Sequence, residues 1–255
     1  GKIFDHKRRI DYYNECFVGR DNETSEVLEW ANSSNSQNVL PIFSSAGMGK
    51  GAFVANLITK LKEEHTPVLY HFCESGLANN LHAILYHLIL QGKKLQIWGD
   101  NVLIGKKHKI PTKYEDVIIL FQNLIENNFV VHKKNTSGNL VIIIDGLDQA
   151  YVSYPSYNIG DYFNTYSENG EIIGDCNYKA ETKWILTYRE GYYKLPSLVN
   201  LYELKKVQPL KGLDEDSIIN ALNWCNENNI NSSGSFQNQK DFNIKAKVQE
   251  NKNST

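Results

Sequence analysis

Hydrophobic and polar positions form blocks along this chain that predict alternating strands and helices. Short apolar runs, typical of buried strands, occupy residues 39–43, 68–73, 140–144, 184–187 and 201–204. Apolar positions recur at helical spacing in the ranges 50–64, 81–91 and 112–127. A further helix, capped by Asp21 or Asn22, is expected to run to about residue 31. Strands that alternate with helices predict an α/β fold, with a mostly parallel sheet and helices on both faces.

The remaining segments suggest how the chain is divided. Residues 1–16 are a basic and aromatic lead-in, and residues 17–209 form the core. Residues 210–227 begin a helical lid domain, in which Asp214 caps a helix. Residues 228–255 are too polar to bury an apolar core and are expected to form a linker or disordered tail. Residues 151–181, rich in tyrosine, follow no helical or strand repeat and are expected to form a long loop.

The first apolar run leads into a candidate phosphate-binding loop. A strand, a turn of small residues, a Gly-Lys pair and a helix follow one another, which is the order that phosphate binding needs. In the pattern G-x-x-x-x-G-K-[ST], Gly49 and Lys50 match, whereas Ser44 replaces the first glycine and Gly51 the hydroxyl residue. The expected binding residues are Ala46, Gly47, Met48, Gly49, Lys50, Gly51 and Ala52. The alternative is an ordinary strand–turn–helix corner that needs glycine only for its backbone angles.

Two acidic residues follow the most apolar run, at residues 140–144. Asp145 and Asp148 come where the expected strand ends, and open α/β sheets bind ligands at that edge. In a nucleoside triphosphatase on this scaffold, a loop lysine reaches the phosphates, one acid holds Mg²⁺ and another positions the attacking water. Lys50, Asp145 and Asp148 fit these three roles in that order. The alternative for the two acids is a turn with two side-chain caps.

Five segments of the chain, between residues 17 and 225, match one protein family when they are taken together. They are Phe17-Val18-Gly19-Arg20-Asp21, Ala46-Gly47-Met48-Gly49-Lys50, Tyr70-His71-Phe72-Cys73, residues 143–149 and residues 185–190. Together they resemble the nucleotide-binding core of STAND NTPases, most closely the NACHT-like branch, which is related to AAA+ ATPases. The resemblance implies a switch that binds ATP or ADP with Mg²⁺. It also implies self-oligomerisation or protein partners through flanking domains, in a defence or innate-immune-type pathway.

The resemblance also implies roles for further residues. Val18, Gly19 and Arg20 match the segment that lies along adenine and ribose. Asp145 matches the Mg²⁺-linked aspartate, Asp148 the catalytic acid and Arg189 the sensor arginine near the γ-phosphate. Pro209 resembles the proline that closes over adenine from the lid. The alternatives are a surface salt bridge for Arg189 and a strand-ending proline for Pro209.

The departure at Gly51 limits the activity that is expected. Without a hydroxyl at this position, Mg²⁺ must be held by Asp145 and water, whereas the loop amides and Lys50 still bind phosphate. We therefore expect hydrolysis to be slow or absent. A pseudo-NTPase that serves as a scaffold for protein interaction is the alternative, which Gly51 and Ser44 favour. A small-molecule kinase is less favoured, because the sequence shows no acceptor-site motif.

Composition excludes several other classes of function. The chain has 255 residues, of which 41% are hydrophobic and 22% charged, so it can bury a full core. Its formal net charge of −2 gives no electrostatic footprint for nucleic acid or an acidic membrane. It has no membrane-spanning apolar run and no signal-peptide pattern, and its four cysteines form no C-x-x-C pair, so we expect a cytoplasmic protein. Its seven histidines follow no metal-binding motif, so we expect no histidine-based metalloenzyme. Because residue 1 is Gly, we expect a segment of a longer protein.

Overall fold

A computed structural model describes the part of the chain that carries most of these expectations. The described residues are 6–15, 17–34, 37–73, 80–98, 110–127, 139–153, 164–166, 172–175, 182–192, 213–214, 216–220 and 223. The expected strand at 201–204, Pro209 and the polar tail at 228–255 lie outside them. Among the described helices, none has both the length and the apolar character needed to cross a membrane.

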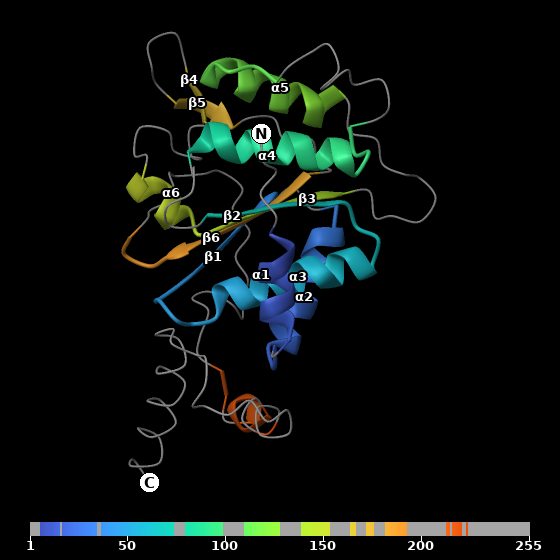
Figure 1. Cartoon of the computed structure of the whole chain (residues 1–255), viewed down its shortest axis with the longest axis vertical. Helices are drawn as coiled ribbons and strands as arrows, with labels where there is room; N and C mark the ends of the chain where they lie inside the picture. The colour runs from blue at the N-terminus through green and yellow to red at the C-terminus, as the bar shows by residue number, and fades with distance from the viewer. Residues whose placement is uncertain are drawn as a thin grey trace.

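A four-stranded parallel sheet forms the centre of the molecule, in the order β1-β6-β3-β2 (Figure 1). The strands are β1 (Val39–Ser44), β2 (Val68–Phe72), β3 (Leu140–Asp145) and β6 (Thr182–Arg189). Every residue of β3 is buried, as expected for a central parallel strand that is covered on both faces. The α/β fold class predicted from the alternation of elements is confirmed.

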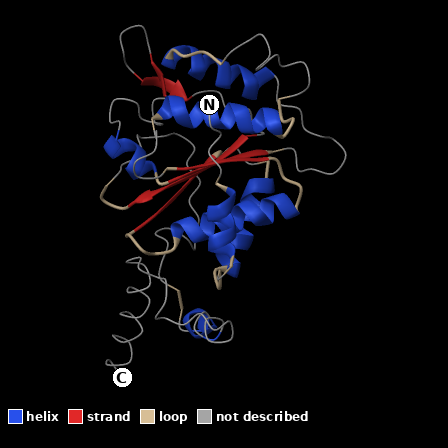
Figure 2. Ribbon diagram, in the orientation of Figure 1, coloured by secondary structure: helices blue, strands red, loops and turns tan. Residues whose placement is uncertain are grey.

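Helices cover both faces of this sheet (Figure 2). One layer consists of α1 (Lys7–Asn14), α2 (Asp21–Asn32) and α3 (Lys50–Glu63), and the other of α4 (Leu81–Lys94) and α5 (Tyr114–Asn127). Consecutive residues of β3 face opposite layers: Ile143 belongs to the same buried core as Leu57 of α3, whereas Ile142 belongs to the core that contains Leu85 of α4. Each such buried side chain contributes about 1.5–3 kcal/mol. The two cores therefore hold the carboxyl ends of the strands in fixed relation.

The structure differs from two sequence-based expectations. No side chain at Asp21 or Asn22 caps α2. Arg20 precedes the helix instead, with a left-handed φ of 64°, and Asp21 lies in its first turn, where a carboxylate favours the helix dipole. The segment 151–181, expected to be a loop, contains the end of α6 (Leu147–Ser153) and an antiparallel pair, β4 (Asn164–Tyr166) and β5 (Ile172–Asp175). These strands are too short to show a repeat in the sequence.

The cap expected at Asp214 is confirmed. The backbone N–H of Ser217 donates to Asp214 Oδ1 at 2.8 Å, and the N–H of Ile218 donates to the Asp214 carbonyl at 3.0 Å. Residues 216–220 are helical. That this helix begins a lid domain stays a prediction.

Candidate functional site

The candidate residues gather at the carboxyl ends of neighbouring strands. In the register of β1 with β6, Ser44 lies opposite Arg189. Asp145 ends β3, the strand on the other side of β6, and Asp148 lies in the first turn of α6. The charges that act on Lys50 are those of Asp145, Asp148 and Arg189. The structure thus brings together the four charged residues that the sequence analysis proposed for phosphate, metal and water.

The loop between β1 and α3 has the conformation that its glycines permit. Gly47 and Gly49 have φ values of 82° and 81°, in the left-handed region that favours glycine. Gly49 occupies the N-cap position of α3, and Lys50 is the first residue of that helix. The positive end of the α3 dipole therefore lies in this loop, as an anion-binding loop requires.

Lys50 folds back over its own loop. Its Nζ donates to the Ser44 carbonyl at 2.8 Å, to Ser44 Oγ at 2.9 Å and to the Ser45 carbonyl at 2.9 Å. Burial removes water from the ammonium group and lowers the pKa of Lys50, whereas the charges of Asp145 and Asp148 oppose that shift. Ser44, at the position where the pattern has glycine, thus supplies an acceptor that glycine could not.

Asp145 is a buried carboxylate that is held from two sides. Thr187 Oγ1 donates to Asp145 Oδ1 at 2.6 Å, and the same hydroxyl accepts the N–H of Gly146 at 3.0 Å. A guanidinium nitrogen of Arg9 lies 3.6 Å from Asp145 Oδ2. Burial raises the pKa of Asp145 because it disfavours the charged form, and Thr187, Arg9 and Lys50 counteract part of this rise. Thr187 therefore orients the carboxylate, and Arg9 supplies positive charge beside it.

Asp148 binds the end of β6. Its Oδ1 accepts the backbone N–H of Arg189 at 3.1 Å, and its Oδ2 lies 3.3 Å from Arg189 Nε. The Asp148 side chain is 6% exposed and that of Arg189 is 42% exposed. Arg189 therefore forms a salt bridge, and its partner is a candidate residue of the same site. This pairing is compatible with the role of a sensor arginine that the family resemblance implies.

The segment Val18-Gly19-Arg20 lies against the loop and the helix at 216–220. A buried Arg20 donates from Nη2 to the Met48 carbonyl at 3.1 Å. Burial lowers the pKa of Arg20, and the charges of Glu23 and Asp214 oppose the shift. A Cβ at Gly19 would lie 2.4 Å from Ser217 Oγ, so only glycine allows this close approach. Gly19 and Arg20 thus lie beside the candidate phosphate loop and the helix at 216–220. Pro209, the other residue proposed to contact adenine, lies outside the described residues.

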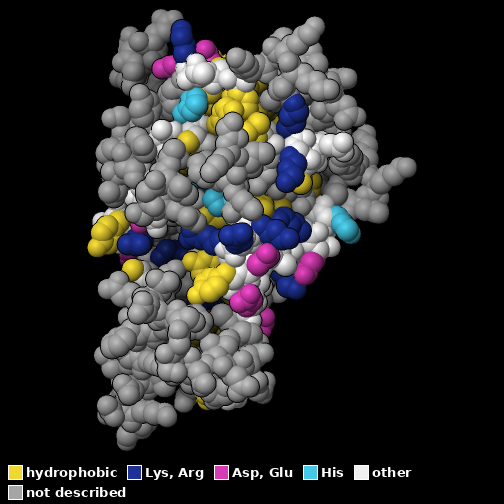
Figure 3. All heavy atoms as spheres, in the orientation of Figure 1, with side chains coloured by type: hydrophobic (Ala, Val, Ile, Leu, Met, Phe, Trp, Pro, Cys, Tyr) yellow, Lys and Arg dark blue, Asp and Glu magenta, His cyan; other side chains and the backbone are white. Residues whose placement is uncertain are grey.

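Helix α1 also contributes to the site, although no motif in the sequence indicates it. The Arg9 guanidinium lies 4.8 Å from the ring centre of Phe72 and 5.5 Å from that of Tyr13. A Cβ at Gly51 would lie 3.3 Å from Tyr13 Oη, so Tyr13 fills the space into which a Ser or Thr side chain would project. Figure 3 shows Lys and Arg side chains in a band across the region where Figure 1 places α1 and α3. The only signal in the sequence was the spacing of Arg9 and Tyr13, which places them on one helix face.

Comparison with known proteins places the chain in a family. A family model described as Nephrocystin 3, N-terminal, matches residues 22–168. No curated protein matches the chain. Among solved structures, the ADP form of the Aeropyrum pernix ORC2 protein is similar at 14% sequence identity with a TM-score of 0.38, over 74% of this chain and 47% of that chain. The chain thus spans about half the length of that structure.

The family match spans more than half of the 255 residues and includes the loop around Lys50 together with Asp145 and Asp148. Those residues lie at one edge of a parallel sheet of the P-loop NTPase kind, between two layers of helices. The chain therefore belongs to the Nephrocystin 3, N-terminal family and is a NACHT-related P-loop NTPase domain.

Proposed function

We propose that this domain binds ATP or ADP and acts as a conformational switch, with hydrolysis slow or absent. The observation that carries the proposal is the convergence of Lys50, Asp145, Asp148 and Arg189 beside the Gly47–Gly49 loop. The proposed signalling role, with self-oligomerisation or protein partners and a place in a defence or innate-immune-type pathway, is supported by the family resemblance.

Lys50 and the loop would hold the phosphates. In the described conformation, Lys50 Nζ donates to two carbonyl groups and one hydroxyl group. Phosphate oxygens carry negative charge, so their bonds to the Lys50 ammonium would add a charge–charge attraction that the neutral Ser44 and Ser45 acceptors cannot supply. Binding would therefore exchange Ser44 and Ser45 for phosphate at Lys50, while the backbone of the loop and the α3 dipole complete the anion site.

Asp145 would supply one ligand to Mg²⁺, and the protein would leave the rest of the coordination sphere to phosphate and water. Mg²⁺ prefers an octahedral set of oxygen ligands, commonly one or two carboxylates with phosphate oxygens and waters. Asp145 supplies one carboxylate and Gly51 supplies no ligand. When bound, the ion would neutralise charge on the phosphate oxygens. Arg9 lies on the same carboxylate, so metal binding requires Arg9 to move, and we attribute slow turnover to this competition.

Asp148 would position the attacking water once Arg189 moves. Both of its oxygens are engaged by Arg189 in the described conformation. The Arg189 side chain is 42% exposed and could turn toward a γ-phosphate, while Asp148 Oδ1 would keep the backbone N–H of Arg189 as its donor. Movement of Arg189 would couple the presence of a third phosphate to the freedom of Asp148, which is the differential contact that a nucleotide-gated switch needs.

A scaffold without nucleotide turnover is the second candidate function. It is favoured by α1, whose Arg9 lies beside Asp145 and whose Tyr13 fills the space next to Gly51. In this case the site would keep its charges paired within the protein, and the surface would serve protein interaction.

A thermal-shift titration with ATP and ADP, each with and without Mg²⁺, separates the two candidates. Binding predicts a rise in Tm with nucleotide that is lost in Lys50→Ala. Lys60→Ala is the matched control, because Lys60 lies exposed on the same helix and pairs only at the surface, with Glu63 at 2.9 Å. Absence of a shift with every nucleotide would leave the scaffold function.

A further inference from the structure

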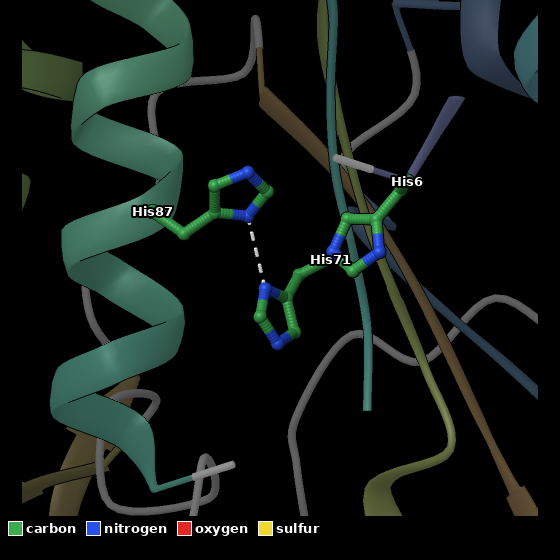
Figure 4. Close-up of side chains that lie close together, drawn as sticks. All are labelled: His6, His71 and His87. Atoms are coloured by element: carbon green, nitrogen blue, oxygen red, sulfur yellow. Dashed lines mark hydrogen bonds between the residues drawn. The ribbon is translucent and has the colours of Figure 1, made fainter. Parts of the chain in front are cut away.

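Three buried histidines from separate parts of the chain meet in one place (Figure 4). His6 directly precedes α1, His71 lies in β2 and His87 lies in α4. One ring nitrogen of each lies within 4.8 Å of the others, and the two Nδ1 atoms of His71 and His87 are 3.0 Å apart. Figure 4 shows the three rings gathered around a common space between the helix and the strand. This cluster has no part in the nucleotide site described above.

We propose that His6, His71 and His87 bind a divalent cation of the zinc class. Imidazole suits zinc and its neighbours among the late transition metals. Three imidazoles with a water in the fourth position are an established tetrahedral zinc set. At a zinc–nitrogen distance of about 2.0–2.1 Å, two ligands of a tetrahedron lie about 3.3 Å apart. The observed 3.0 Å between His71 and His87 is close to that separation. The three ring nitrogens lie within 4.8 Å of one another, so metal binding would draw the rings closer together by up to about 1.5 Å to reach the tetrahedral separation.

The surroundings keep His71 in the form that binds metal. Burial lowers the pKa of His71 well below its ordinary value, and a proton on His6 or His87 would lower it further. A neutral imidazole presents a lone pair, and metal ligands must be deprotonated. When His71 and His87 face each other through Nδ1, at most one proton can lie between those two atoms, so at least one lone pair points into the shared space.

Aromatic side chains hold His6 in the cluster. Its ring lies 5.3 Å from that of Phe72 and 6.4 Å from that of Tyr70, measured between ring centres. The backbone N–H of Phe72 donates to His6 Nε2 at 3.4 Å, a long hydrogen bond that also holds the ring beside β2. Because His6 directly precedes α1, which carries Arg9, a bound cation would fasten the beginning of α1 to β2 and α4. The metal would thereby favour the position of α1 in which Arg9 lies beside Asp145.

The test uses the full chain, freed of metal with a chelator and titrated with Co²⁺ and then Zn²⁺. We expect one equivalent of Co²⁺ to produce the visible absorption of a tetrahedral complex, and Zn²⁺ to abolish it by displacement. At free zinc about 100 times Kd, Tm should rise by roughly 5–10 °C. His6→Gln and His87→Gln should each weaken binding at least about tenfold. His82→Gln, a change of another histidine in α4, should bind like the unmodified chain.

A second measurement does not depend on how the variants fold. X-ray absorption at the zinc edge of the unmodified chain should show three imidazole nitrogens at about 2.0–2.1 Å. The proposal is overturned if the folded chain binds no stoichiometric metal, or if folded His6→Gln and His87→Gln bind it unchanged. It is also overturned if the absorption spectrum lacks the three imidazoles, as it would for a neutral hydrogen-bonded histidine cluster. Nucleotide-induced shifts in the same samples report separately on the proposed nucleotide site.

Discussion

The two sides of the candidate site differ in how closely they match a working P-loop NTPase. On the phosphate side, Gly47 and Gly49 have the left-handed backbone that the loop needs, and Lys50 begins the helix. On the metal side, Gly51 has no ligand atom, and Arg9 of α1 lies 3.6 Å from the Asp145 carboxylate. One side thus keeps its anion-binding parts, while the other carries a protein cation where a metal would be expected.

Under the proposed function, this difference assigns binding and turnover to separate parts of the site. Anion binding rests on backbone geometry, the helix dipole and one lysine, all of which belong to the β1–α3 unit. Metal-assisted hydrolysis also needs oxygen ligands from residues 51 and 145, which lie on different elements. A helix that carries Arg9 and Tyr13 can therefore suppress the second function without disturbing the first.

The largest expected effect is on the phosphate side. Lys50→Ala should weaken ATP binding by about 10–100-fold, because a charged hydrogen bond is worth about 1.5–3 kcal/mol. The loss should be the same with and without Mg²⁺, since Lys50 acts on phosphate. Isothermal titration calorimetry measures both affinities. A loss confined to the Mg²⁺ condition would contradict the separation of the two sides.

A side chain at residue 51 should disturb the metal side. Gly51→Thr should lower the free energy of unfolding by about 1–3 kcal/mol, because its Cβ would lie 3.3 Å from Tyr13 Oη. Urea unfolding measures this change.

Tyr13→Ala provides the control for that change. In the double variant the threonine should fit, so that the coupling energy between the two changes should be about 0.5–3 kcal/mol. The double variant should also hydrolyse ATP faster than the unmodified chain, because a hydroxyl ligand is restored where Tyr13 no longer lies. Additive effects on stability would mean that Tyr13 does not limit the space at residue 51.

Removing the protein cation should favour the metal. Arg9→Ala should lower the Mg²⁺ concentration that gives half of the full Mg²⁺ effect on ATP affinity by about fivefold. This factor corresponds to an ion pair worth about 1 kcal/mol. Arg8→Ala is the matched control, because Arg8 is the exposed neighbour on the same helix. The measurement is ATP affinity over a series of Mg²⁺ concentrations. Equal behaviour of the two variants would show that Arg9 does not compete with the metal.

The smallest expected effect is on the free energy of unfolding, which burial of the ionised Asp145 carboxylate lowers. Because its pKa is raised, the folded chain takes up this proton more readily than the unfolded chain. The free energy of unfolding therefore falls as pH rises from the ordinary range of aspartate through the raised folded pKa. Asp145→Asn should remove that loss and gain up to about 1 kcal/mol at neutral pH.

The pH dependence distinguishes this effect from a general change in packing. The advantage of Asp145→Asn should shrink as pH falls toward about 4, the ordinary pKa of aspartate. Urea unfolding at several pH values measures it. An advantage that is independent of pH would show that ionisation of Asp145 is not its cause.

Much of the fold could be predicted from local patterns. The buried β-branched run at β3 and the Gly-Lys pair before α3 are signals within a few residues, and both were located correctly. The strand expected at 184–187 runs on to Arg189 in the structure, and the role of Arg189 came from the family resemblance alone. The end of β3 was predicted from the apolar run, which placed Asp145 near Lys50. Parallel strands end at one edge of a sheet, so the order of elements was sufficient for that inference.

Other features depend on contacts between distant segments. Neither the contact of Tyr13 with Gly51 nor the placement of Arg9 beside Asp145 has a local pattern, because each joins α1 to an element far along the chain. The short strands β4 and β5 were missed for a related reason, since three or four residues cannot display a repeat.

The sequence by itself determined the α/β class and the strand–loop–helix order around Lys50, since these follow from periodicity and local spacing. Only the tertiary structure decided that α1 covers the metal side and that His6, His71 and His87 share one buried space. Side chains that are 16 and 65 residues apart become neighbours only when a helix and a strand pack together, and packing depends on the shape of the whole core. The loop of Lys50 could therefore be predicted from the chain, whereas the placement of α1 beside Asp145 could not.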